Sequence, residues 1–185
     1  MENKYRVDHV DSSLPRWLIE VAFLCLIAQS VINWSPLLIW MEENASWLQA
    51  IVQTVGPVVM YVGLLRGMRS LYHPCRIWWW VMIVLNLLGF ISLTFPGLPI
   101  EYNLTLAVSL MFIYVPFGCL LALSYQGRLR QVGIWMALYM LISAIIPTLC
   151  YLLIENMEGF NTLWLEVPTV GVNLIYACVL RRVLV

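Results

Sequence analysis

Six long apolar stretches constrain the fold of this chain more than any other feature. A helix needs about 20 mostly apolar residues to cross a bilayer. A chain of 185 residues, 62% hydrophobic and 11% charged, has too little interior to hide such stretches in a soluble fold. The sequence therefore predicts an all-α integral membrane protein with a single transmembrane domain over residues 1–185. The six predicted transmembrane helices are Trp17–Trp40, Trp47–Leu65, Ile77–Phe95, Leu104–Tyr125, Val132–Ile154 and Thr162–Leu180.

The charged residues indicate how these spans are oriented. With six spans, all ten basic residues fall on one side of the membrane: Lys4, Arg6, Arg16, Arg66, Arg69, Arg76, Arg128, Arg130, Arg181 and Arg182. The three loops on the other side carry only acidic charges: Glu42, Glu43, Glu101, Glu155 and Glu158. Because cytoplasmic loops carry the excess of Lys and Arg, both termini are predicted to be cytoplasmic, with residues 1–16 as a cytoplasmic tail.

Prolines recur at matched intervals along the chain. The separations within the pairs Pro36–Pro57, Pro96–Pro116 and Pro147–Pro168 are 21, 20 and 21 residues, and each pair encloses an acidic loop. This pattern predicts three tandem helical hairpins, residues 17–73, 74–130 and 131–185, related by rotation about the membrane normal. The alternative is a chance alignment, because the chain holds nine prolines and proline is common in membrane helices.

Polar residues near the second proline of each hairpin point to a candidate site. A proline inside a helix frees the carbonyl four residues earlier, and in lipid that carbonyl needs a partner. We therefore expect an outward-facing site near the proline kinks, with the candidate ligand-binding residues Gln53, Tyr114, Glu166 and Asn173. In the alternative, the bundle has no cavity and its amides hydrogen-bond between helices. These amides are Gln29, Asn33, Gln53, Asn86 and Asn173.

Two acidic residues within the predicted spans have separate interpretations. Glu166 is the best functional candidate, because ionisable residues inside a membrane mark functional sites by default. Thr169 and Asn173 share its helical face, which we expect to turn toward protein or an aqueous cavity. The alternative for Glu166 is snorkelling to the outer headgroups. Glu20 is expected near the cytoplasmic headgroups, paired with Arg16 one turn earlier.

The sequence carries no motif of a familiar enzyme, and no cofactor or metal site is expected. The five cysteines form no C-x-x-C pair. His9 and His73 both lie outside the spans, which argues against a haem held by two histidines between helices. No H-E-x-x-H, G-x-S-x-G or P-loop pattern occurs. We therefore do not expect an enzyme.

Two functions are compatible with these features. The first is a small solute-binding or transport-related protein of the plasma membrane, expected to be a bacterial inner membrane. The second is a non-catalytic accessory, immunity or stress protein that binds a membrane partner. The lipid bilayer is a partner in both cases, and nucleic acid is not expected. A cavity on which the candidate residues converge would favour the first function, and a solid bundle would favour the second.

Overall fold

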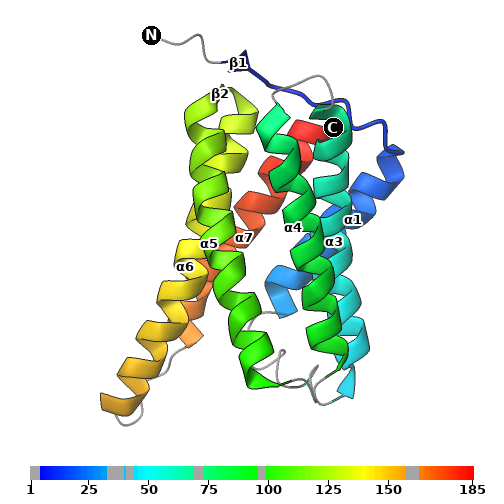
Figure 1. Ribbon diagram of the computed structural model, residues 1–185. Helices are drawn as coiled ribbons and strands as arrows, with labels where there is room; N and C mark the ends of the chain where they lie inside the picture. The colour runs from blue at the N-terminus through cyan, green and yellow to red at the C-terminus, as the bar shows by residue number, and fades with distance from the viewer. Residues whose placement is uncertain (1–4, 33–39, 41–43, 69–72, 96–98, 157–162) are drawn as a thin grey trace.

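The computed structural model describes residues 5–32, 40, 44–68, 73–95, 99–156 and 163–185. Within these residues the chain is almost entirely helical (Figure 1). Its helices fall on the six predicted apolar stretches, which confirms the all-α class. The elements are α1 (Arg16–Ile32), α3 (Ser46–Gly67), α4 (His73–Thr94), α5 (Ile100–Ser124), α6 (Arg128–Asn156), α7 (Leu163–Leu184), β1 (Tyr5–Arg6) and β2 (Tyr125–Gln126).

Several helices are suited to a bilayer. In the part of the chain that the structure describes, three are long and apolar enough to cross a membrane: Ser46–Gly67, Cys75–Thr94 and Val167–Leu184. Only helices and closed barrels satisfy all backbone polar groups within lipid, so a helical bundle is the fold that such segments require. The count of six spans stays a prediction.

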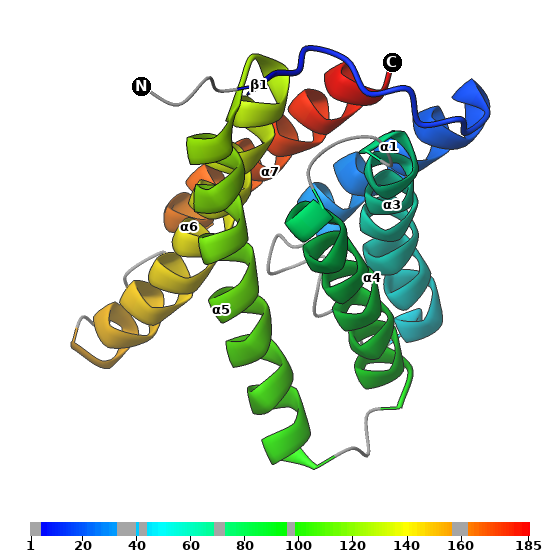
Figure 2. The same cartoon turned by 45° about the horizontal axis from the view of Figure 1, so that its top comes forward.

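The helices form a ring in the order of the chain. Each packs against the next, from α1 through α7, and α7 returns to pack against α1 (Figures 1 and 2). The α5–α6 pair has the most extensive contact and α4–α5 the least among these neighbours. Helix α3 also touches α7 across the ring. This arrangement leaves a central space to which every helix can contribute side chains.

The large buried side chains gather toward one end of the ring. That end holds the start of α1, α4 and α6 and the end of α3, α5 and α7, so the arginines of the described helices lie there. The fully buried side chains lie within a few turns of it: Trp79, Tyr61, Tyr125, Phe117, Met60, Leu64, Met68, Met82, Leu121, Leu129, Met136 and Leu180. We call it the arginine end.

An N-terminal strap, residues 5–14, crosses the arginine end (Figure 2). Strand β1 pairs in parallel with β2, and the Val10 amide donates to the Val183 carbonyl at 2.8 Å. The strap is buried at Val7 and Val10. A β-carbon added at Gly67 would collide with Val10. Glycine at that position therefore allows the strap to lie directly on the end of α3.

Asp8 fixes the strap to the start of α6. Its carboxylate accepts a 2.7 Å hydrogen bond from the Arg6 guanidinium and another from the Arg128 backbone N–H. The Arg6 contact holds the pKa of Asp8 below its ordinary value of 3.8. A depressed carboxyl pKa means that the contact is complete at neutral pH and is lost as the pH falls through that lowered pKa.

An ion pair joins the first helix to the last. The Arg181 guanidinium donates two hydrogen bonds to the Glu20 carboxylate, at 2.7 and 2.8 Å, and it also lies 5.1 Å from the centre of the Phe23 ring. The hydrogen-bonded partner of Glu20 is therefore Arg181, while Arg16, the expected partner, contributes a charge interaction with the Glu20 carboxylate. A planar guanidinium matches both carboxylate oxygens at once, and the contact between α1 and α7 brings Arg181 into position for this bidentate pair.

Candidate functional site

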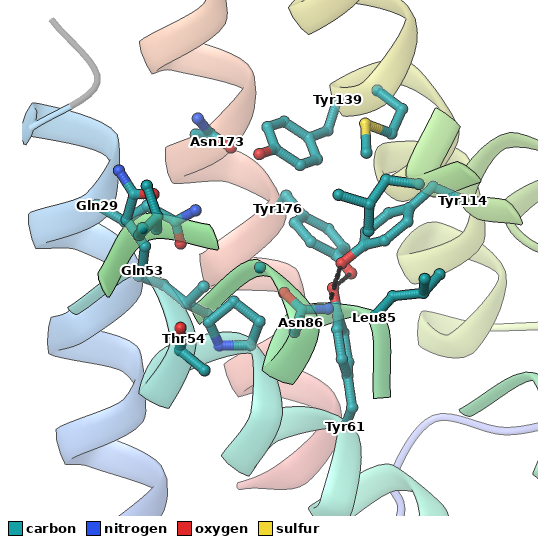
Figure 3. Close-up of a pocket in the computed structure, with 16 residues that line it drawn as sticks. Gln29, Gln53, Thr54, Tyr61, Leu85, Asn86, Tyr114, Tyr139, Asn173 and Tyr176 are labelled. Carbon is teal, nitrogen blue, oxygen red and sulfur yellow. Dashed lines mark hydrogen bonds between the residues drawn. The ribbon is translucent and has the colours of Figure 1, made fainter. Parts of the chain in front are cut away.

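A cavity of about 230 Å³ lies in the centre of the ring (Figure 3). All six described helices contribute to its wall, which explains why no single segment of the sequence reveals it. The lining residues are Leu26, Gln29, Gln53, Thr54, Pro57, Tyr61, Leu85, Asn86, Gly89, Leu93, Leu110, Tyr114, Tyr139, Met140, Asn173 and Tyr176.

Three tyrosine hydroxyls meet at one side of the cavity. The hydroxyl of Tyr61 lies 3.1 Å from that of Tyr114 and 3.0 Å from that of Tyr176. The side-chain amide of Asn86 donates to Tyr114 at 2.9 Å (Figure 3). We call these four residues the tyrosine cluster. They come from α3, α4, α5 and α7, so the cluster links helices on opposite sides of the ring.

Aromatic packing closes the space between the tyrosine cluster and the arginine end. Trp79 is fully buried, with its ring centre 5.4 Å from that of Tyr61 and 4.7 Å from that of Phe117. Trp78 stacks on Phe117 at 5.8 Å. Edge and stacked contacts of this kind add to the stability gained from burial alone. Trp79 and Phe117 therefore pack between Tyr61 and the arginine end.

Amide groups occupy another part of the wall. Gln29, Gln53 and Asn173 line it from α1, α3 and α7 (Figure 3). Asn173 is 7% exposed, and its Nδ2 atom has no hydrogen-bond partner among the described residues. A buried polar group without a hydrogen-bond partner is rare and costs free energy. A bound molecule could accept a hydrogen bond from the Asn173 side-chain amide and remove this cost.

The described side chains of the cavity wall are polar or apolar, without a charge. None of its described lining residues is Asp, Glu, Lys, Arg or His. Amide and hydroxyl groups provide hydrogen bonds, while Leu26, Leu85, Leu110 and Met140 provide apolar surface. A charged molecule would lose its hydration here without gaining a counter-charge, which is costly. The arrangement therefore suits an uncharged molecule that has both apolar surface and hydrogen-bonding groups.

Three of the four predicted site residues come together in the structure. Gln53, Tyr114 and Asn173 line the same cavity. Glu166 belongs to α7 by its backbone, but its side chain lies outside the described part of the structure, so its predicted direction stays a prediction. Gln29 and Asn86, whose favoured interpretation was hydrogen bonding between helices, also line the cavity. Asn33 lies outside the described residues.

The prolines contribute less than their spacing suggested. Pro57 is buried and lines the cavity, whereas Pro116 and Pro168 are exposed and do not line it. Pro36 and Pro96 lie outside the described residues. Tyr114 and Asn173, the candidate residues near Pro116 and Pro168, do line the cavity, and the expectation of a site near three proline kinks stays a prediction. The closed ring of helices, rather than a shared proline layer, creates the cavity.

The sequence did not identify Tyr61, Tyr139, Tyr176 or Gly89 as site residues. Tyrosine and tryptophan in membrane helices ordinarily mark the headgroup level, and that interpretation hides tyrosines that point inward. One signal was available: Tyr61, Tyr114 and Tyr176 each lie in the second helix of a predicted hairpin. Tyr139 stacks on Tyr176 with ring centres 5.9 Å apart, which extends the aromatic wall onto α6.

The described residues form no candidate metal site. In the described ranges, no three His, Cys, Asp or Glu side chains lie close enough together to hold an ion. The described lining of the cavity offers amide and hydroxyl groups for hydrogen bonds and leucine and methionine side chains for apolar contact. Searches among protein families, curated proteins and solved structures find no match to this chain.

Proposed function

We propose that this protein is a six-span plasma-membrane protein that binds a small uncharged solute in its central cavity, as a solute-binding or transport-related protein. One observation carries the proposal. The cavity is lined by all six described helices, and the buried Asn173 presents an unpartnered amide nitrogen there. A bundle built only to support a membrane partner has no need of a polar central cavity. The accessory function is therefore the less favoured alternative.

An orientation with both termini in the cytoplasm agrees with the position of the cavity. The arginine end would face the cytoplasm under the positive-inside rule. Trp79 and Phe117 pack between that end and the tyrosine cluster. A solute would then enter from the external side and rest on the tyrosine cluster. This places the proposed site within the membrane and closed toward the cytoplasm.

Cysteine labelling in intact cells tests this proposal. In a cysteine-free background, Gly89→Cys would place a thiol in the cavity, because a β-carbon added at Gly89 meets nothing within 4 Å. We expect a membrane-impermeant maleimide, added outside, to label Gly89→Cys and the exposed Asn44→Cys. The exposed Arg182→Cys at the arginine end is expected to react only after the membrane is permeabilised.

Each position tests a separate part of the proposal. Labelling of position 182 but not position 44 from outside would reverse the orientation. If position 44 is labelled and position 89 is not, the orientation stands and the outward-facing site is contradicted. Labelling of positions 44 and 89 together, with position 182 protected, is the result that the proposal requires.

A further inference from the structure

The tyrosine cluster has three hydroxyl protons but only two hydroxyl-to-hydroxyl hydrogen bonds. Three phenol hydroxyls carry three protons, and two hydroxyl-to-hydroxyl bonds consume two of them. Tyr61 donates to Tyr114, so the remaining bond requires that Tyr176 donate to Tyr61. The proton of Tyr114 is then left over.

The Asn86 atom that contacts Tyr114 is a donor and cannot accept the remaining Tyr114 proton. The Nδ2 atom of Asn86 donates to the Met82 carbonyl at 2.7 Å and to the Tyr114 hydroxyl at 2.9 Å. A backbone carbonyl can only accept, so the atom that faces it must be the amide nitrogen. The Tyr114 oxygen thus receives hydrogen bonds from Asn86 and Tyr61, and its own proton is available to the cavity that Tyr114 lines.

Asn173 supplies a second donor at the same cavity. Its Nδ2 atom is buried and has no partner among the described residues, so its two N–H protons are unused. Tyr114 lies on α5 and Asn173 on α7, and leucine and methionine side chains cover other parts of the wall. The Tyr114 hydroxyl and the Asn173 amide are therefore both hydrogen-bond donors that have no acceptor among the described residues.

We infer that the cavity selects small uncharged molecules that carry a carbonyl-type hydrogen-bond acceptor, for which the Tyr114 hydroxyl and the Asn173 amide are the available donors. This inference rests on the proposed function and names the ligand class of the same site. A volume of about 230 Å³ equals the liquid volume of about eight water molecules, which suits a molecule of one ring. The acceptor oxygen accepts a hydrogen bond from these donors, and the ring occupies the apolar part of the wall.

A series of four probes with one common ring tests the ligand class. Acetophenone carries a carbonyl acceptor, ethylbenzene carries none, benzoate is an anion and benzylammonium is a cation. Binding to the full chain in detergent micelles is measured by calorimetry at pH 7. The variant Gly89→Phe, whose added ring would fill the cavity, corrects for partition into the micelle. We expect acetophenone to bind about tenfold more tightly than each of the other three, since a buried donor is costly to leave unpaired.

Three variants assign this preference to the two donors. Tyr114→Phe and Asn173→Leu each remove one donor, and each is expected to reduce the preference for acetophenone over ethylbenzene to about threefold or less. Tyr61→Phe also breaks bonds within the tyrosine cluster but leaves the Tyr114 proton in place. It is therefore expected to keep the preference, whatever its effect on absolute affinity. Thermal unfolding of each variant identifies any that does not fold.

The outcomes separate the inference from the proposed function. If the four probes bind equally, or if an ion binds most tightly, the ligand class is wrong while binding in the cavity still holds. If Tyr61→Phe loses the preference as fully as Tyr114→Phe, the assignment of the unused proton is wrong. If no probe binds the wild type beyond the Gly89→Phe background, both the ligand class and the proposed solute site are contradicted.

Discussion

Replacing Gly89 by phenylalanine is expected to abolish solute binding while the protein remains folded. Gly89 lines the cavity, and a β-carbon added there has no atom within 4 Å. A phenyl ring can therefore enter the cavity without displacing the backbone of a neighbouring helix. Glycine within a helix is also less stable than alanine by about 0.5–1 kcal/mol, so the added β-carbon itself carries no penalty.

Gly171→Phe is the matched control for this variant. A β-carbon at Gly171 also meets nothing within 4 Å, but Gly171 lies on α7 and does not line the cavity. Acetophenone binding measured by calorimetry should be undetectable for Gly89→Phe and close to the wild-type value for Gly171→Phe. Equal binding by Gly89→Phe and the wild type would mean that the solute occupies another place.

Replacing Gly133 by alanine is expected to lower the stability of the helical bundle strongly. The added β-carbon would lie 2.5 Å from the Gly118 carbonyl oxygen and 2.8 Å from the Ala122 backbone nitrogen. These are backbone atoms, so α5 and α6 must move apart. Overpacking of this kind costs about 1–3 kcal/mol, and more where the backbone must shift. We expect a clear fall in the unfolding midpoint in mixed micelles.

The reciprocal substitution and a control make this prediction specific. Gly118→Ala would place its β-carbon 2.6 Å from the Gly133 carbonyl oxygen, so it should destabilise the protein by a similar amount. Gly171→Ala adds the same methyl group in open space, and it should be neutral or slightly stabilising. A Gly133→Ala protein as stable as the wild type would contradict the close crossing of α5 and α6.

The helices and part of the site could be predicted because their signals lie along the chain. Apolar stretches locate the helices, and an amide such as Gln53 or Asn173 is conspicuous within them. Tyr61 and Tyr176 are not conspicuous, because the amphipathic ring of tyrosine fits the lipid headgroup region as well as the interior of a helical bundle. Only the positions of neighbouring helices reveal that these two rings face inward and meet Tyr114.

Close contacts between distant segments were harder to predict for the same reason. Gly63 and Gly67 form a small-residue pair that favours close approach of another helix. In the structure Gly63 faces Leu184 of α7, but Gly67 lies beneath the N-terminal strap. The sequence gives no local sign of the Gly118–Gly133 crossing, because these two glycines are on different helices. The rotational repeat of the three hairpins stays a prediction.

Locating a heavy-atom probe in crystals tests the solute site most directly. Crystals of the full chain would be soaked with 4-bromoacetophenone, and the anomalous signal of bromine would mark its position. We predict a bromine peak inside the cavity, with the carbonyl oxygen of the probe within hydrogen-bonding distance of Tyr114 or Asn173. The same soak with Gly89→Phe should give no such peak. Bromine found only on the outer surface of the helices would contradict a solute site at the centre of the ring.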